Sequence, residues 1–283
     1  HRMKDGYGLN DNLIKEALEA GIDTVITCDN GIAAAPQIHM AKDNGMTVIV
    51  TDHHEVPYEE TDGKRIYLIP PADAVVDPKQ EDCGYPFKQI CGAVVAGKLV
   101  SVLLRSAGDL EQKAKLQEEL LVFGALATVC DVMELRDENR IIVKEGLRLM
   151  AGTFNLGLKA LLMVNGIENM AAASGTLTPY HAGFVIGPCM NASGRLDTAE
   201  RALALFDCRE WSEAVNIAGD LKSLNDNRKM MTEQGVLEAV WQVENGGMKT
   251  DKVLVIYLPD CHESIAGIIA GRIREKYGKP AFV

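Results

Sequence analysis

The hydrophobic pattern in the first third of the chain alternates between helical spacing and short apolar runs. Helical spacing predicts helices over residues 10–20 and 33–44. Apolar runs with β-branched residues predict a buried strand over residues 22–28 and a second strand over residues 46–51. A third, short strand is expected at residues 74–76. Strands that alternate with helices in this way specify a parallel sheet.

The middle of the chain predicts further helices. Two largely buried helices are expected over residues 92–106 and 112–128, and a third over residues 143–150, because apolar residues dominate each stretch. Residues 171–188 hold Gly, Ser, Thr and Pro at a frequency typical of turns, which predicts a surface loop over a cleft. An alanine-rich helix should follow over residues 198–205.

The pattern changes again beyond residue 210. Residues 212–243 form a long amphipathic segment, as expected of a helix that connects two domains. Strand, helix and strand patterns follow over residues 253–257, over residues 262–276 and at Pro280, so a second α/β unit is expected to begin here. The predicted fold class is therefore α/β, with a parallel sheet, a helical insert, a long connecting helix and the start of a second α/β domain.

Composition places the chain among globular proteins. Of its 283 residues, 47% are hydrophobic and 24% charged, which is ordinary. Lys98 interrupts the longest apolar stretch, residues 91–104, so no membrane-spanning segment is predicted. Seven cysteines without a C-x-x-C pair indicate reduced thiols and a cytoplasmic protein. Because the first residues show neither an initiator methionine nor a signal core, and the last lie in an expected strand, we expect a piece of a longer protein, open at both ends.

The charge balance limits how the chain could bind a polyanion. Its 29 basic and 40 acidic residues give a formal net charge of -11, which repels nucleic acid as a whole. Any nucleic-acid binding should therefore depend on a local basic surface or on bound metal ions. The aromatic content of 5% is low and argues against platforms on which bases stack.

Candidate chemistry lies in two turns that follow expected parallel strands. The first turn is Asp29-Asn30-Gly31 and the second is Asp52-His53-His54-Glu55. Open parallel sheets bind ligands at the carboxyl ends of their strands, so both turns should lie side by side on one rim. Oxygen and imidazole ligands together suit manganese, zinc or iron, and further carboxylates would favour manganese or magnesium.

Each of these residues also has a structural interpretation. An Asp-Asn-Gly turn can simply reverse the chain, and His53 and His54 can be structural or surface residues. Their rings cannot point the same way, so one could bind a metal while the other faces a substrate. Asp131 ends an apolar run, where an unpaired carboxylate is costly, and this favours a metal ligand over a helix cap.

These residues resemble the motifs of a known family. Asp52-His53-His54 is the signature of the DHH phosphoesterase superfamily, and the flanking segments resemble its RecJ branch, the single-strand-specific DNA exonucleases, over essentially the whole chain. Arg2–Leu9 resembles the segment that comes just after that family's first motif. The other matching segments are, in order, Asp29-Asn30-Gly31, Asp52-His53-His54, residues 85–93, Cys130-Asp131-Val132, residues 186–195 and residues 262–270.

The resemblance implies roles for individual residues. Metal ligation falls to Asp29, His53 and Asp131, with His54 near the scissile phosphate and Asp52 orienting the histidine pair. Substrate binding falls to residues with polar or basic side chains, namely Asn30, Asn191, Arg195 and His262.

The basic residues among these segments leave two interpretations open. Arg195 is the best candidate for a phosphate clamp, and its alternative is an exposed salt bridge. The run of Arg272, Arg274, Lys276 and Lys279 could meet a phosphate backbone or simply lie in water at a helix end.

The same resemblance implies a metal-dependent hydrolase. We expect Mn²⁺ or Mg²⁺, as two ions in the complete enzyme, and 5′–3′ hydrolysis of single-stranded DNA in repair and recombination, with repair or replication proteins as partners and no membrane. An Asp-x-Asp first motif would lie upstream of His1, so the chain as given is expected to hold half of the site and to be inactive or weakly active alone.

Three domain segments and two alternative functions complete these expectations. The DHH domain should cover residues 1–210, the connecting helix residues 211–246 and the start of the DHH-associated domain residues 247–283. One alternative is a DHH phosphodiesterase acting on short oligoribonucleotides or cyclic dinucleotides. The other is a catalytically silent replication scaffold of the same fold.

Overall fold

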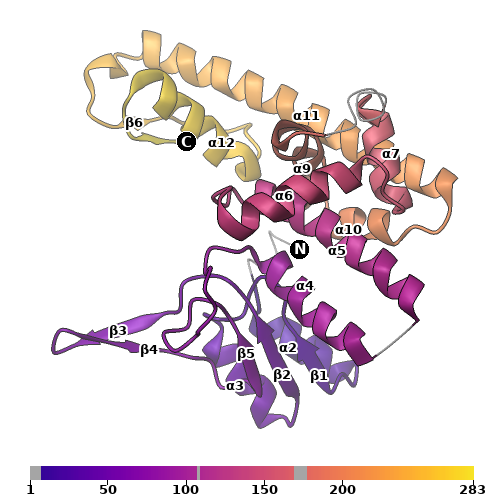
Figure 1. Ribbon diagram of the computed structural model, residues 1–283. Helices are drawn as coiled ribbons and strands as arrows, with labels where there is room; N and C mark the ends of the chain where they lie inside the picture. Colours follow the sequence, from indigo (N-terminus) through magenta and orange to yellow (C-terminus); the bar gives the residue numbers. More distant parts are fainter. Residues whose placement is uncertain (1–7, 107–108, 169–176) are drawn as a thin grey trace. The chain divides into compact units, whose positions relative to one another are not determined.

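The computed structural model describes residues 8–106, 109–168 and 177–283. It divides into two compact units, one of residues 1–155 and 166–187 and the other of residues 156–165 and 188–283. Figure 1 shows the elements in chain order, and each unit is described below by itself. The domain boundaries expected after residues 210 and 246 stay predictions.

The first unit contains a three-stranded parallel sheet in the order β1-β2-β5, as the alternating pattern predicted. Its strands are β1 (Thr24–Ile26), β2 (Thr47–Thr51) and β5 (Ala74–Val76). The register pairs Val25 with Val48 and Val50 with Val75. The expectation that the first strand is buried was wrong, since Ile26 is exposed. In the described part of the chain β1 lies at the edge of this sheet, which explains that exposure.

Helices α2 (Asp11–Glu19) and α3 (Ala35–Asp43) cover one face of this sheet. Asn10 caps α2, because its side-chain oxygen accepts a hydrogen bond from the N–H of Leu13. Both helices bury apolar side chains against β2, in a cluster made of Ile14, Ile38, Ala41, Met46, Val48 and Val50. This cluster holds β2 against the two helices, and the turn that follows β2 is thereby held in place.

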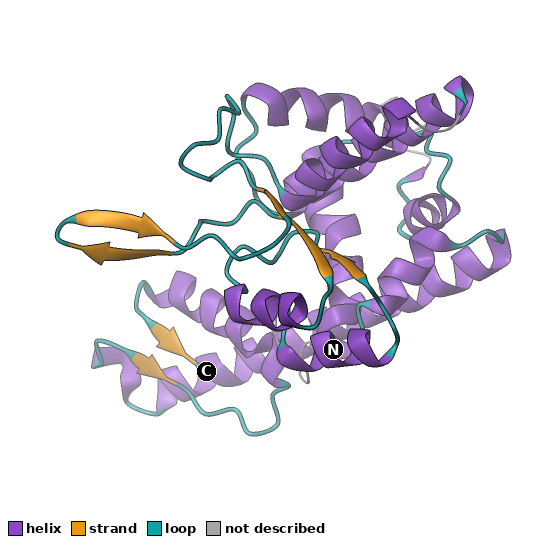
Figure 2. Ribbon diagram, turned by 90° about the horizontal axis from the view of Figure 1, so that it is seen from below, coloured by secondary structure: helices purple, strands orange, loops and turns teal. Residues whose placement is uncertain are grey.

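A separate antiparallel hairpin stands apart from the parallel sheet, as Figures 1 and 2 show. It consists of β3 (Tyr58–Thr61) and β4 (Lys64–Tyr67), and its turn residues Asp62 and Gly63 both have positive φ angles. This combination is typical of a two-residue hairpin turn, for which Asp-Gly is a preferred sequence. The hydrophobic pattern did not predict it, because most of its residues are polar.

The remaining helices of the first unit pack around a second apolar cluster that joins α4 to α5 and α6. Their bounds are Gly92–Leu103 for α4 with the short helix η1 (Leu104–Ser106) after it, Leu110–Cys130 for α5 and Asp137–Met150 for α6. The expectation that α5 is largely buried was wrong for its first half, where charged residues face water. Its second half is apolar and ends at Cys130, next to Asp131.

The loop expected over residues 171–188 was wrong where the structure describes it. Part of it lies outside the described residues, whereas His181–Ile186 form a π-helix, η2, that runs into α9 (Gly187–Leu196). Ala182 and Ile186 are fully buried, which gives the segment a reason to be helical. Pro188 has no N–H to donate to the carbonyl group four residues before it, and this favours the wider π turn.

The second unit is built on the long helix α11 (Trp211–Asn245), close to the predicted amphipathic segment. Helices α7 (Leu156–Val164) and α10 (Glu200–Asp207) pack against its first half. A helix over the α7 residues was not predicted. Against its second half lies a strand-helix-strand unit, composed of β6 (Leu254–Val255), α12 (Glu263–Tyr277) and β7 (Ala281–Phe282), preceded by the short helix η3 (Met248–Thr250).

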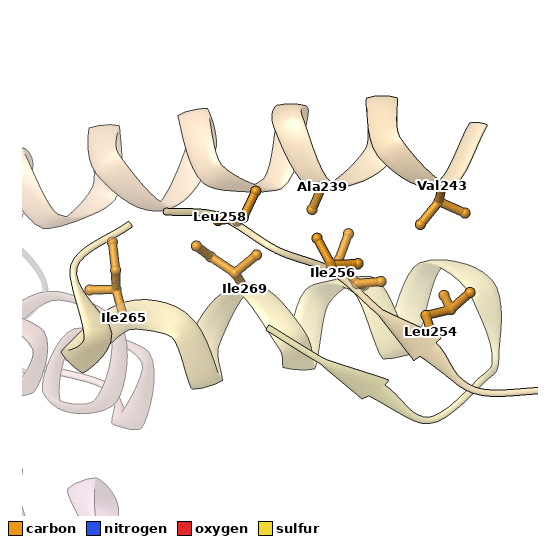
Figure 3. Close-up of a cluster of buried hydrophobic side chains, with 8 residues drawn as sticks. Ala239, Val243, Leu254, Ile256, Leu258, Ile265 and Ile269 are labelled. Carbon is orange, nitrogen blue, oxygen red and sulfur yellow. The ribbon is translucent and has the colours of Figure 1, made fainter. Parts of the chain in front are cut away.

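This strand-helix-strand unit has an apolar core of its own, drawn in Figure 3. Ala239 and Val243 of α11 face Leu254 and Ile256 and, from α12, Ile269, all in one cluster. Strands β6 and β7 are parallel, as the predicted second α/β unit requires. Within the described ranges, none of the helices combines the length and the apolar character that a bilayer crossing needs.

Candidate metal centre and phosphate-binding residues

Two turns lie next to each other on the rim where the parallel strands end. The N–H of Asp29 donates to the carbonyl oxygen of Thr51 at 3.0 Å, and the N–H of Asp52 donates to that of Val76 at 3.1 Å. These bonds extend the strand pairing beyond β1 and β2 into the turns. The prediction that the two turns share one rim is therefore confirmed.

Asp29, His53 and Asp131 converge on this rim. The Nε2 atom of His53 lies 2.9 Å from Oδ1 of Asp29 and 3.4 Å from Oδ2 of Asp131. The His53 side chain is only 7% exposed, whereas the two carboxylates are 54% and 45% exposed. Both carboxylates therefore approach the same nitrogen of His53 and are open to solvent. Among the described residues, the ligand atoms that all lie within 4.8 Å of one another are those of Asp29, His53 and His54. That Asp131 binds the same ion stays a prediction.

His53 has the features of an unsatisfied ligand. Both its ring nitrogens are buried, and neither has an aligned hydrogen-bond partner among the described residues, even though Asp29 is close. The nearby Asp29 carboxylate raises the pKa of His53 despite its burial, and burial raises the pKa of Asp131. A divalent cation would satisfy the imidazole and both carboxylates at once, so these residues fit such an ion.

Asp52 orients His54 and does not point at the same cluster. Its Oδ1 atom lies 2.7 Å from Nδ1 of His54, and its Oδ2 accepts the N–H of Ile32 at 3.0 Å. Burial acts to raise the pKa of Asp52, but N–H donors from Ile32, His53 and His54 outweigh it and lower that pKa. An ionised carboxylate can only accept, so His54 donates from Nδ1 and turns Nε2 outward.

His54 and Asn30 border the open part of the site. His54 is 59% exposed, in contrast to His53. The two rings nevertheless lie 4.6 Å apart, and a ring nitrogen of each lies within 4.8 Å of the Asp29 carboxylate, so the expected division of roles between them stays a prediction. A cavity of about 400 Å³ is lined by Asn30, Asp29, Asp52 and His54 among others. The Asn30 amide is held by the carbonyl oxygen of Cys28, to which Nδ2 donates at 3.0 Å. The cavity gives a substrate access to the exposed carboxylate of Asp29.

Two glycines allow neighbouring segments to approach Asp29 and Cys130 closely. A Cβ atom on Gly92, at the start of α4, would lie 2.3 Å from Oδ1 of Asp29, and one on Gly187 would lie 2.5 Å from Sγ of Cys130. No side chain can occupy the first position while Asp29 keeps its place. The sequence signal was a glycine next to Cys91 at the predicted start of a helix.

Asp77 is a rim residue that sequence reasoning missed. It follows β5 directly, is buried, and has one carboxylate oxygen without a partner among the described residues. Its other oxygen accepts the N–H of Lys79 at 2.8 Å, and burial raises its pKa. The signal was its position after the third predicted strand, the same position that Asp29 and Asp52 hold after the other two.

Asn191, Arg195 and His262 belong to the second unit. Arg195 lies on helix α9, not on the expected loop, and its Nη1 donates to the carbonyl oxygen of Ser264 at 2.8 Å. His262 caps helix α12, where its Nδ1 atom accepts the N–H of Ser264 at 3.3 Å. Asn191 is exposed on α9.

Arg228 of α11 completes a group of arginines that the sequence did not reveal. Burial, then Arg195, then Arg272 lower the pKa of Arg228, and its Nε atom is buried without a partner in the described part of the chain. Like charges gathered in this way lack a counter-charge, and a phosphate group would provide it.

Comparison with known proteins finds a family match within the first unit. The sequence model described as "DHH family, N-terminal domain" matches residues 3–128. Over residues 3–128 the chain is therefore similar to the DHH family. Asp29 and the Asp52-His53-His54 turn lie inside the matched residues, and Asp131 follows them by three residues.

The similarity extends beyond the DHH domain to the whole chain. The chain is 34% identical to the single-stranded-DNA-specific exonuclease RecJ of Bacillus subtilis, with 100% of the chain and 33% of the relative covered. It is also 34% identical to RecJ of Escherichia coli, with 99% of the chain and 48% of the relative covered. The chain thus spans about a third to a half of the length of these curated relatives.

Solved structures support the same relationship. An exonuclease RecJ bound to manganese matches with a TM-score of 0.81 and 32% identity, over 99% of this chain and 65% of that one. RecJ from Thermus thermophilus in complex with Mn²⁺ matches with a TM-score of 0.76 and 31% identity, over 96% of this chain and 37% of that one. The resemblance of this chain to RecJ and its α/β fold class are confirmed.

Proposed function

We propose that the intact protein carrying this sequence hydrolyses phosphodiester bonds of single-stranded DNA, as a 5′–3′ exonuclease that uses Mn²⁺ or Mg²⁺. The observation that carries the proposal is the convergence of Asp29, His53 and Asp131 on one rim, with a buried imidazole that lacks an aligned partner. The relatives matched over the whole chain are named single-stranded-DNA-specific exonucleases, and two matched structures contain manganese.

Asp29, His53 and Asp131 are the proposed ligands. A divalent ion supplies the charge that activates water and stabilises the oxygens of the attacked phosphate. Asp29 is the best candidate for a bridging carboxylate, because it is the more exposed of the two and lines the cavity. Burial holds His53 in place, so its ring loses little freedom when it binds.

His54 is the proposed group that contacts the reacting phosphate. Asp52 fixes its tautomer through the 2.7 Å contact at Nδ1, which leaves Nε2 free to face the cavity. A protonated Nε2 can donate to a phosphoryl oxygen or to the leaving oxygen. Asp52 thus acts as a positioning residue and His54 as a catalytic residue in this proposal.

Arg195, Arg228 and Arg272 are proposed to bind backbone phosphates. In the described part of the chain none of the three forms an ion pair with a carboxylate, and Arg195 is anchored by the Ser264 carbonyl group. Fixed guanidinium groups bind phosphate well because they present several N–H donors in one plane. We place Asn191 and His262 near this group as further substrate contacts, since they lie on the same two helices.

We also propose that the chain acts in the cytoplasm. All seven cysteines are free, which fits a reducing compartment. Repair or replication proteins are the class of partner that a single-strand exonuclease would meet there.

Hydrolysis of end-labelled single strands tests this function. The intact protein carrying this sequence should release nucleotides from the 5′ end of a single-stranded 20-mer when Mn²⁺ is present, and much less from a duplex. Asp29→Asn and Asp131→Asn should each lower kcat by at least about 100-fold, because each removes a charged ligand. Asp62→Asn is the matched control, since asparagine also adopts the left-handed conformation found at this surface turn.

Two results would contradict the proposal. Hydrolysis that persists in Asp29→Asn, or in the presence of a chelator, would show that the rim cluster does not hold the catalytic ion. Faster cleavage of a cyclic dinucleotide or of a short oligoribonucleotide than of the DNA strand would favour the alternative phosphodiesterase.

A further inference from the structure

Two exposed aromatic rings stack on each other in the first unit. Tyr180 and Phe184 are 63% and 69% exposed, their centroids are 5.3 Å apart and their planes differ by 19°. His181 meets Tyr180 edge-on at 6.0 Å. Of the ring pairs among the described residues, the pair of Tyr58 and Tyr67 meets edge-on, whereas Tyr180 and Phe184 are stacked. Burying these rings against a ligand would be favourable.

The segment that carries the rings is firmly anchored. The Nδ1 atom of His181 accepts the N–H of Thr178 at 3.0 Å, and Ala182 and Ile186 are fully buried on the other side of the helix. The two rings lie four residues apart, Phe184 within the π-helix η2 and Tyr180 at its cap, and π-helical turns are rare and occur often at functional sites. The rings are therefore presented to solvent by a fixed backbone.

The same helix packs directly against the end of α5, next to the candidate metal centre. The thiol of Cys130 donates to the carbonyl oxygen of Ala182 at 3.7 Å. A Cβ atom on Gly183 would lie 3.3 Å from Cγ1 of Val129. Cys130 precedes Asp131, so the aromatic pair and the proposed ligand Asp131 are held by one packed assembly within the first unit.

The sequence around the pair would tolerate a polyanion. Between Glu168 and Asp197 there is no Asp or Glu, although the chain has 40 acidic residues and a formal net charge of -11. A phosphate backbone near Tyr180 and Phe184 would therefore meet no carboxylate from this stretch. The absence of acidic residues distinguishes this stretch of sequence from most of the chain.

We propose that Tyr180 and Phe184 form a stacking platform for the bases of the single-stranded substrate. The inference rests on the proposed function and adds to it how the strand is held beside the metal centre. A base has two apolar faces and stacks on an aromatic ring with little dependence on its identity, as an exonuclease that degrades any sequence requires. Duplex bases are already stacked on each other, so the platform would favour single strands.

Binding to strands with and without bases tests the platform. Dissociation constants of the intact protein for a labelled 12-mer of thymidylate and for an abasic 12-mer with the same phosphates are measured by fluorescence anisotropy, with Ca²⁺ in place of Mn²⁺. Phe184→Ala should weaken binding of the thymidylate strand about 10-fold and leave the abasic strand unchanged. Phe184→Trp should restore binding. Phe154→Ala removes another exposed phenylalanine of the same unit and is the matched control.

The outcomes separate this inference from the proposed function. Equal binding of the thymidylate strand by wild type and by the double variant Tyr180→Ala, Phe184→Ala would overturn the platform, whether or not the protein hydrolyses DNA. Equal weakening for both strands would also overturn it, because that result indicates a lost phosphate contact or a disturbed fold. Base-dependent binding without Mn²⁺-dependent hydrolysis would support the platform and contradict the proposed function alone.

Discussion

Asp29 depends on its backbone surroundings as much as on its own carboxylate. Its φ angle is +64°, which is unusual for a residue other than glycine, and Gly31 after it has φ +114°. The turn also needs Gly92, whose hydrogen leaves space that a methyl group would take from the Asp29 side chain. A small change in a neighbour should therefore move the proposed ligand.

Gly92→Ala tests this dependence. The new methyl group would lie 2.3 Å from Oδ1 of Asp29, so the carboxylate must move away from His53. We expect at least about a 10-fold loss of Mn²⁺ affinity, the effect of disturbing the partner of a metal ligand. Calorimetric titration measures it.

Gly97→Ala is the matched control in the same helix. A methyl group there meets only Leu120 at 4.0 Å and should leave Mn²⁺ affinity unchanged while stabilising α4 slightly. Equal Mn²⁺ affinity in the Gly92 and Gly97 variants would show that the close approach of Gly92 does not position Asp29.

At the residue scale, the sequence predicted the residues that come together on the rim. Asp29 and His53 could be placed because each follows a recognisable strand, and Asp131 because it ends an apolar run. Asp77 also follows a predicted strand, but no known motif marked it. Arg228 could not be predicted from the sequence, because only the tertiary fold brings Arg195 and Arg272 near it.

Elements with strong periodicity were predictable, and those set by contacts were not. The three parallel strands and the long helix α11 follow from alternating and amphipathic patterns. Helix α9 contains glycines and a proline that predict a loop, yet buried contacts outweigh these propensities. The hairpin β3–β4 had a usable signal in its Asp-Gly turn.

Packing between α7 and α10 offers a prediction at the element scale. A Cβ atom on Gly157 of α7 would lie 2.0 Å from the carbonyl oxygen of Leu205. Because a backbone atom cannot move aside, Gly157→Ala should lower the free energy of unfolding by about 1–3 kcal/mol. Urea denaturation followed by circular dichroism measures it.

Gly219→Ala provides the comparison on helix α11. Nothing lies within 4 Å of a Cβ atom there, so this change should raise stability by up to about 1 kcal/mol through helix propensity. If Gly157→Ala were as stable as Gly219→Ala, α7 and α10 would not pack as closely as described.

At the scale of the whole molecule, the charge distribution reconciles an acidic chain with a polyanionic substrate. A net charge of -11 opposes DNA, while Arg195 and Arg272 lie close enough to Arg228 for their charges to lower the pKa of its guanidinium group. Attraction by a few local arginines should make binding moderately dependent on salt. Net charge alone could not reveal this, because it sums over surfaces that DNA never meets.

The salt dependence of binding tests the arginine group. Each phosphate contact contributes about 0.7 to the slope of log K against log salt for a single strand. Arg195→Ala should therefore weaken binding and reduce the slope by about 0.7, and it should raise KM more than it lowers kcat. Arg209→Ala, which removes an arginine outside this group, is the control. An unchanged salt dependence of binding in Arg195→Ala would show that Arg195 does not contact a phosphate and that its role is the structural hydrogen bond to Ser264.

Direct titration of Mn²⁺, followed by the electron paramagnetic resonance signal of the free ion, shows whether the rim cluster holds a metal. The wild-type protein is predicted to bind Mn²⁺, and Asp29→Asn, His53→Gln and Asp131→Asn are each predicted to weaken binding at least about 10-fold, with Asp62→Asn unchanged. His53→Gln is the decisive variant. Both ring nitrogens of this buried imidazole lack an aligned hydrogen-bond partner among the described residues, and a bound ion would provide one. Wild-type Mn²⁺ affinity in His53→Gln would show that the rim cluster does not bind the ion through this imidazole.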